Sequence, residues 1–274
     1  MEMLVRLFGQ PAAIYADLEK RTTVASVFLS RFTPQDRAGL RRTLHVLAEA
    51  GLNLGPARVS ARRIPRENWA ESWKRHFKPL EISRKLFVIP SWSRTKPKPG
   101  QAVVVLDPGL SFGTGHHPTT GFCLEQLALR RRVGASQSLL DAGCGSGILA
   151  IAGVKLGYSP VIAFDFDPDA VRVAKENAAA NKVSLRVSRG DLTKLPVEVR
   201  CPFDVVCANL IYDLLIQERR RLLARLAPAG TLVLAGILKE QFPAVRRAYE
   251  EVGLKLVAQK LAGEWRSGAF QFLH

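Results

Sequence analysis

With 274 residues, 47% hydrophobic and 23% charged, the chain has the composition of an ordinary globular protein with room for one moderate domain and a smaller partner. The net charge is +16, and residues 1–100 carry +11 of it, with 19 Lys and Arg against 8 Asp and Glu. No apolar run approaches the roughly 20 residues that span a bilayer, no secretory signal opens the chain, and the four cysteines form no CxxC pair. These features exclude a membrane-spanning or disulfide-stapled protein, so we expect a cytoplasmic protein with no membrane association.

The first 63 residues alternate between expected strands and helices. We expect strands over residues 1–8, 23–32 and 57–64, and helices over residues 11–21 and 33–52. Thr33 is a good N-cap for the second helix, because Pro34 stands at the first helical position. The alternation predicts a small α+β domain over residues 1–63, with a ferredoxin-like order.

Residues 64–100 read as a linker helix and a connecting segment. In "RENWAESWKRHFKPL", Trp69, Trp73 and Phe77 recur at a spacing of four, which is one stripe of an amphipathic helix. We interpret the stripe as a packing seam between domains, with a stacking platform for nucleic acid as the alternative. "PSWSRTKPKPG" is rich in proline and basic residues, as is typical of a stiff connection.

Residues 101–274 show a different pattern, in which short apolar runs alternate with helical segments. The runs are "SLLDAG", "VIAFDFD", "LRVSRGD", "FDVVCANL" and "GTLVLAGI". Strands that alternate with helices predict a parallel, doubly wound α/β sheet. Two stretches around Gly263 add a final antiparallel pair, so we expect a seven-stranded, Rossmann-like domain.

The sharpest motif is "LLDAGCGSGILAIA", an apolar strand followed by three alternating glycines and a helix. Gly143 and Gly145 let the backbone turn tightly and approach a ligand, and the start of the helix offers free N–H groups. The third glycine of a dinucleotide fingerprint would fall on Ile148, so the nicotinamide motif is not met. The turn therefore predicts a different ligand, and a merely structural turn is the alternative.

Two acidic residues restrict the class of ligand that the turn can bind. Asp165 ends the next strand, where a carboxylate can accept both hydroxyls of a ribose. Asp141 can receive an ammonium group. The set offers acceptors without a Lys or Arg, which favours S-adenosylmethionine over a pyrophosphate.

Two later polar residues fit the same ligand. Asp191, in "SRGDL", is a candidate partner of the adenine amino group, with simple solvation of a loop acid as the alternative. Asn209 stands at the carboxyl end of a strand, where its amide oxygen can accept from an incoming amine. The alternative for Asn209 is a structural turn residue.

Several of these stretches together resemble one known family. "ENWAESWKRHFKPLEI", "LDPGLSFGTGHHPTT", "DAGCGSGILAIAGVKLG", "FDFDPDAV", "ANLIYDLL" and "GILKEQ" followed by "GEW" look like the lysine methyltransferases that modify large-subunit ribosomal protein eleven. The resemblance covers about residues 64–270, whereas the first sixty residues match only in the order of strands and helices. "NLIY" replaces the "NPPY" of amide and base methyltransferases, which argues against a planar substrate.

The resemblance implies that the N-terminal domain recognises the substrate and that the loop "SFGTG" closes over S-adenosylmethionine. Carried over residue by residue, it implies cofactor contacts at Thr120, Gly143, Asp165 and Asn209. A metal site is not expected, because His116 and His117 are adjacent, so their side chains point in different directions, and no acid or thiol pattern completes a site. The phosphate-loop motif is absent.

The implied reaction is methyl transfer to lysine side chains, and to the N-terminal amine, of ribosomal protein eleven. We expect Asn209 to orient the neutral amine, His116 or His117 to assist, and Trp265 to wall the amine channel. Three alternatives remain open: a methyltransferase of another protein's lysines, one of RNA, and a ribosome-binding module with a vestigial pocket.

The expected partner is ribosomal protein eleven, free or on the ribosome. The basic N-terminal third adds contact with ribosomal RNA as a further expectation, and a solvated arginine-rich surface is the alternative reading of its charge. A monomer is the expected state.

Overall fold

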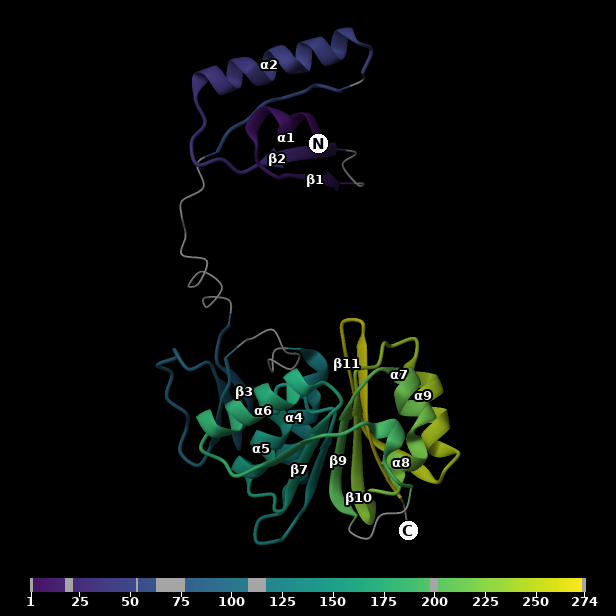
Figure 1. Ribbon diagram of the computed structural model, residues 1–274. Helices are drawn as coiled ribbons and strands as arrows, with labels where there is room; N and C mark the ends of the chain where they lie inside the picture. Colours follow the sequence, from purple (N-terminus) through teal and green to yellow (C-terminus); the bar gives the residue numbers. More distant parts are fainter. Residues whose placement is uncertain are drawn as a thin grey trace. The chain divides into compact units, whose positions relative to one another are not determined.

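In a computed structural model, the chain divides into two compact units, Met1–Trp69 and Ala70–His274, which are described separately (Figure 1). The structure describes residues 2–17, 22–52, 54–62, 77–107, 117–197 and 202–272. No helix in these ranges is long and apolar enough to cross a membrane.

The first unit combines two helices with one antiparallel pair of strands. Its elements are α1 (Glu2–Phe8), β1 (Ala12–Asp17), β2 (Thr22–Val27) and α2 (Pro34–Glu49). As the sequence predicts, Thr33 caps α2: its hydroxyl accepts from the backbone N–H of Asp36 at 3.2 Å, and Asp36 accepts from the backbone N–H of Thr33 at 2.7 Å. These two bonds form a capping box, which stabilises the start of the helix.

Three local expectations for this unit are wrong. Glu2–Phe8 form a helix where a strand is expected, because Leu4, Leu7 and Phe8 fit a helical spacing as well as a strand. Residues 12–17 form a strand, which pairs with β2, although a helix is expected there. The strand expected over 57–64 is not seen in residues 57–62. The described part of the unit holds one strand pair, so a ferredoxin-like arrangement stays a prediction.

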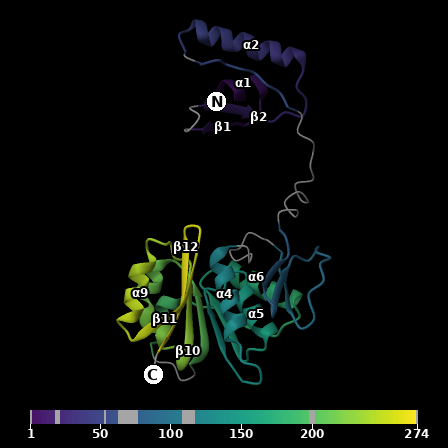
Figure 2. The same ribbon diagram turned by 180° about the vertical axis from the view of Figure 1, so that it is seen from behind.

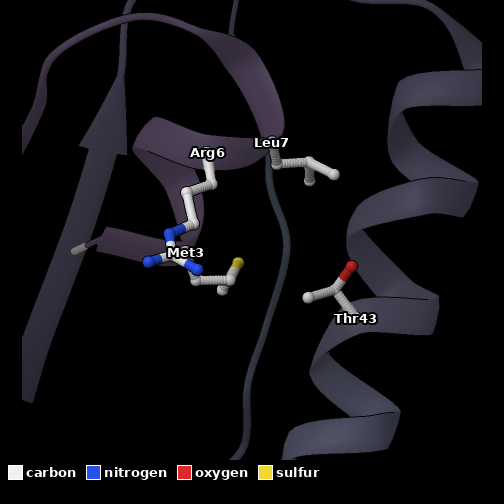
Figure 3. Close-up of a pocket in the computed structure, with 4 residues that line it drawn as sticks. All are labelled: Met3, Arg6, Leu7 and Thr43. Atoms are coloured by element: carbon white, nitrogen blue, oxygen red, sulfur yellow. The ribbon is translucent and has the colours of Figure 1, made fainter.

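A hollow lies between α1 and α2, with a volume of about 470 Å³. Met3, Arg6 and Leu7 line it from α1, and Thr43 lines it from α2 (Figure 3). Leu4 is the one buried side chain among the residues of this unit whose burial is described. The described part of the unit therefore buries little apolar surface.

The second unit is built on a seven-stranded sheet in the order β11-β12-β10-β9-β6-β7-β8. All neighbours are parallel except β12, which runs antiparallel to both β10 and β11. The strands are β6 (Leu139–Ala142), β7 (Val161–Asp165), β8 (Arg186–Arg189), β9 (Phe203–Asn209), β10 (Leu226–Ala235), β11 (Leu254–Ala262) and β12 (Trp265–Phe272). The doubly wound α/β sheet and the terminal antiparallel pair around Gly263 are thus confirmed.

Helices cover both faces of this sheet (Figures 1 and 2). One face packs against α4 (Pro118–Arg130), α5 (Ile148–Leu156) and α6 (Pro168–Ala180). The other packs against α7 (Tyr212–Gln217), α8 (Arg219–Leu223) and α9 (Phe242–Glu250). A 3-10 turn, η2 (Leu192–Lys194), follows β8. Both faces are buried, which explains why the strands read as continuous apolar runs.

A second, three-stranded sheet belongs to the same unit. Its strands are β3 (Leu80–Ser83), β4 (Leu86–Ile89) and β5 (Ala102–Val105), with β3–β4 antiparallel and β4–β5 parallel. Leu86 and Val104 are fully buried in the core that α4 and α5 share. Residues 80–89 are therefore part of the folded unit, whereas we expected a connecting segment; four-residue strands are too short to show a period. The linker helix that the sequence predicts falls largely on residues 63–76, which lie outside the described residues.

Candidate cofactor and active site

Three polar side chains lie at or next to the carboxyl ends of three neighbouring strands, on the same face of the large sheet. Asp141 lies in β6, Asp165 ends β7 and Asn209 ends β9, and the three strands are parallel neighbours. Because side chains alternate along a strand, these residues share a face with Ala163 and Cys207, which pack in the core beneath α4, α5 and α6. Ligands of open parallel sheets bind at this carboxyl edge.

The turn after β6 depends on its glycines. Gly143 has a φ of +76° and Gly147 one of +79°, values that side chains rarely allow. A Cβ added at Gly143 would lie 2.4 Å from Cδ2 of Leu210, and one added at Gly147 would lie 2.9 Å from Cβ of Ala174. Each of these glycines therefore allows a neighbouring segment to pack against the turn, and a larger residue would have to displace that segment.

The carboxyl group of Asp141 is almost completely enclosed, with 1% of the residue exposed. Its Oδ2 accepts from the backbone N–H of Ala150 at 3.1 Å, while its Oδ1 is buried and has no hydrogen-bond partner within the described ranges. Burial raises the pKa of Asp141 to about 7, and the negative charge of Asp165 adds to the rise, which the Ala150 N–H opposes. Oδ1 is therefore an acceptor that no donor among the described residues satisfies.

The carboxylate of Asp165 holds the glycine turn in place. Its Oδ2 accepts from the backbone N–H of Gly145 at 2.8 Å, and its Oδ1 accepts from the N–H of Asp167 at 3.0 Å. Beside it, the ring of Phe166 is 63% exposed, and the Arg189 guanidinium carbon lies 5.9 Å from the ring centre. Asp165 therefore places an anionic edge next to an exposed aromatic surface.

The amide of Asn209 is held by α4. Its Nδ2 donates to Oγ1 of Thr120 at 3.4 Å, and Thr120 is 1% exposed. Its Oδ1 is buried and unpartnered among the described residues. Gly236, which follows β10 with a φ of +82°, lets the chain pass close by, since an added Cβ would lie 3.1 Å from that Oδ1. The structure thus brings Thr120 and Asn209 together and leaves the amide oxygen available.

Trp265, at the start of β12, contacts His117, the N-cap residue of α4. Their ring centres are 4.9 Å apart in an edge-to-face arrangement. Nδ1 of His117 lies 2.7 Å from the hydroxyl of Thr119. Partial burial lowers the pKa of His117, and the charge of Glu264 opposes this. Of the two candidate histidines, His117 lies one helical turn before Thr120, while His116 falls outside the described residues.

Asp191 is engaged in the local fold. It caps η2, and its Oδ1 accepts from both the N–H and the hydroxyl of Thr193, at 3.0 and 2.7 Å. Its Oδ2 lies 3.6 Å from Nζ of Lys194. The bonds from Thr193 lower the pKa of Asp191. A contact between Asp191 and an adenine therefore stays a prediction.

Helix α6 connects the glycine turn to the small sheet. Nδ2 of Asn177 donates to the carbonyl of Ser146 at 2.8 Å. One turn later, Asn181 pairs with both backbone groups of Val105: its Oδ1 accepts from the N–H at 2.8 Å and its Nδ2 donates to the carbonyl at 2.6 Å. One helix thus fixes the turn and the end of β5.

Sequence reasoning missed three parts of this site. Leu210 packs over Gly143, Gly236 admits the close approach to Asn209, and Phe166 exposes its ring beside Asp165. The signals were weak: Leu210 and Phe166 directly follow residues that were identified, and Gly236 is one glycine after an apolar strand. Among the described residues, no group of three or more His, Cys, Asp or Glu is placed to hold a metal ion.

The residues present fit S-adenosylmethionine. Two buried acceptor oxygens, on Asp141 and Asn209, have no partner in the described structure, and the glycine turn follows β6, which lies between β9 and β7 in the sheet. An ammonium donor and a ribose suit acceptors of this kind, whereas a pyrophosphate does not. The fold and the site together define the class of S-adenosylmethionine-dependent methyltransferases.

Comparison with known proteins identifies the family. The family model described as ribosomal protein L11 methyltransferase (PrmA) matches residues 7–272. The ribosomal protein L11 methyltransferase of Geobacter metallireducens is 41% identical over 88% of this chain and 80% of its own length. The protein of the same name from Streptococcus uberis is 35% identical over 96% of this chain and 84% of its own length. The crystal structure of ribosomal protein L11 methylase from Lactobacillus delbrueckii subsp. bulgaricus superposes with a TM-score of 0.63, at 31% identity, over 72% of this chain and all of that one. The chain belongs to the ribosomal protein L11 methyltransferase (PrmA) family.

Proposed function

We propose that this protein transfers methyl groups from S-adenosylmethionine to amino groups of ribosomal protein L11. Relatives that match 88% and 96% of this chain are named ribosomal protein L11 methyltransferase. The observation that carries the proposal is the buried Oδ1 of Asn209 at the carboxyl edge of the sheet, which has no partner among the described residues. A neutral amine offers N–H donors to such an oxygen, and its lone pair is then directed away from Asn209.

When bound, the cofactor supplies a methyl group already activated by a sulfonium centre, so the protein's task is alignment and exclusion of water. Asp141 would receive the ammonium group, Asp165 the ribose hydroxyls, and the ring of Phe166 offers an apolar surface to the base. Thr120 fixes the amide of Asn209 through its hydroxyl. Trp265 and His117 would line the path of the amine, with His117 as the proton acceptor among the described histidines.

The proposed substrate and the net charge bear on where the reaction takes place and on what the enzyme associates with. We propose a cytoplasmic enzyme because its proposed substrate is a ribosomal protein, and the +16 net charge favours association with ribosomal particles. The expectations that the N-terminal unit recognises the substrate, that ribosomal RNA is contacted and that the protein is a monomer belong to this proposal.

The test is transfer of a radiolabelled methyl group to purified ribosomal protein L11, with total RNA and a mixed protein lysate as competing acceptors. We expect label on L11 amines, located by mass spectrometry. Asn209→Ala should lower turnover about 100-fold, because a misplaced acceptor loses its alignment. Glu250→Gln, at an exposed ion pair of α9, is the matched control and should leave turnover unchanged. Label on RNA or on another protein would contradict the proposed substrate, and full turnover of Asn209→Ala would contradict the orienting role.

A further inference from the structure

The carboxyl group of Asp141 stands in an unusual place for a carboxylate. The titratable groups that interact with it, among the described residues, come from four segments around it, while α5 contributes the N–H of Ala150 and none of these groups. They are Cys123 of α4, Cys207 of β9, Cys144 of the glycine turn and Asp165 of β7. Burial raises the pKa of all three thiols, which are therefore neutral at physiological pH. None of these groups is a cation.

The hydrogen bonds around Asp141 also give little stabilisation to a negative charge. One N–H, from Ala150, reaches Oδ2, and no donor among the described residues reaches Oδ1. A buried carboxylate is stable only when it is paired or fully hydrogen-bonded. A neutral carboxylic acid, which carries its own proton, suits this enclosure better than an anion does.

We propose that binding of the cofactor expels a proton from this protein: at pH 6, Asp141 is a neutral acid in the free state and ionises when an ammonium group reaches its Oδ1. The O–H bond of Asp141 breaks, its proton passes to solvent, and the anion is retained as the partner of the ligand's cation. This inference rests on the proposed function. S-adenosylhomocysteine carries the same ammonium group, so it should expel the proton as well.

The proposal sets the pH dependence of binding. Only the ionised form of Asp141 pairs with the ammonium group, so between pH 7 and pH 5, where the ligand's amine is protonated, affinity falls as pH drops. With a pKa of about 7, the dissociation constant at pH 5 should be about 50-fold higher than at pH 7. The ligand's amine stays protonated throughout this range, because α-amino groups titrate near pH 7.7–8.0.

Calorimetry with S-adenosylhomocysteine tests the proposal. Titrations in buffers of different ionisation enthalpy give the number of protons released per ligand. We expect about 0.9 protons at pH 6 and about 0.5 at pH 7. Asp141→Asn mimics the neutral acid and should bind more weakly at pH 7, with no proton release and a nearly flat pH dependence. Asp169→Asn, an exposed residue of α6, is the matched control and should behave as the wild type does. His117 also lies near the site, and any proton that it takes up would persist in Asp141→Asn.

Each outcome decides between the two proposals. Binding without proton release at pH 6, or release that persists in Asp141→Asn, would overturn the inference and leave the proposed function intact. Failure of the wild type to bind S-adenosylhomocysteine at any pH would overturn the proposed function, and this inference with it. Infrared difference spectra of the wild type give a measurement that needs no variant. The C=O band of one neutral carboxylic acid should disappear on binding, and its persistence would contradict the proposal.

Discussion

The two units of this chain are stabilised in different ways. The second unit encloses two apolar clusters, one on each face of its sheet, with Phe270, Tyr249 and Leu139 fully buried. In the first unit, Leu4 is the one buried side chain whose burial is described, and α2 has none. Large apolar side chains are exposed there instead, at Val5, Leu7, Ile14, Val24, Phe28, Val46 and Leu52. Burial therefore determines the structure of the second unit, and local bonds such as the α2 capping box have more weight in the first.

The largest difference in stability between matched changes in the two units should come from removing an aromatic side chain. Phe270→Ala takes a fully buried ring from its contact with Tyr249, 5.6 Å between ring centres, and should cost about 3–5 kcal/mol in the free energy of unfolding. Phe28→Ala is the matched change in the first unit, where Phe28 is 67% exposed, and should cost less than about 0.5 kcal/mol. Urea titration measures both. An equal cost would show that Phe28 is covered in solution.

One substitution should have opposite signs in the two units. Gly153→Ala in α5 would place a Cβ 2.3 Å from Cδ2 of Leu139, and we expect a loss of about 1–3 kcal/mol. Gly39→Ala in α2 meets nothing within 4 Å, and should stabilise that helix by about 0.5–1 kcal/mol because alanine loses less entropy. Hydrogen exchange of α5 and α2 amides reports each helix separately. If both substitutions change helix stability in the same direction, the contrast between the two units is wrong.

The smallest effect concerns the capping box. Thr33→Ala removes the hydroxyl that accepts from the N–H of Asp36, and should destabilise α2 by about 1 kcal/mol. Amides of the first turn of α2 should exchange faster, while amides of the large sheet should not change. Thr33→Ser keeps the hydroxyl and should restore protection. Faster exchange in both units would mean that the units unfold together.

The same contrast explains which parts of the fold the sequence could predict. The runs that became β6, β7 and β9 are buried on both faces, so their apolar character and their length identify them. Residues 1–17 lack that constraint: Leu4, Leu7 and Phe8 suit a helix as well as a strand, and tertiary pairing with β2 decided the conformation of β1. The strands β3 and β4 were missed because four residues show no period.

The site was predictable where chemistry depends on residues next to strand ends. Asp141, Asp165 and Asn209 each end or lie in a short apolar strand, and parallel topology then brings them to one edge. Contacts that depend on packing between distant segments gave no such signal. Leu210 over Gly143 and the pairing of Asn181 with Val105 join residues that are 67 and 76 positions apart, and only the fold reveals them.

Asn177 in α6 and Asn181 at its C-cap make the end of that helix a spacer between the glycine turn and the small sheet. Asn177 donates to the carbonyl of Ser146 in the glycine turn, and Asn181 accepts from the N–H of Val105 at the end of β5. Four residues of helix rise about 6 Å and return to nearly the same side of the axis. A single residue inserted between Asn177 and Asn181 would turn the second by about 100° and separate it from Val105. Evolution can therefore replace the exposed side chains of α6 freely, while insertions and deletions at its end would shift one wall of the site against the other.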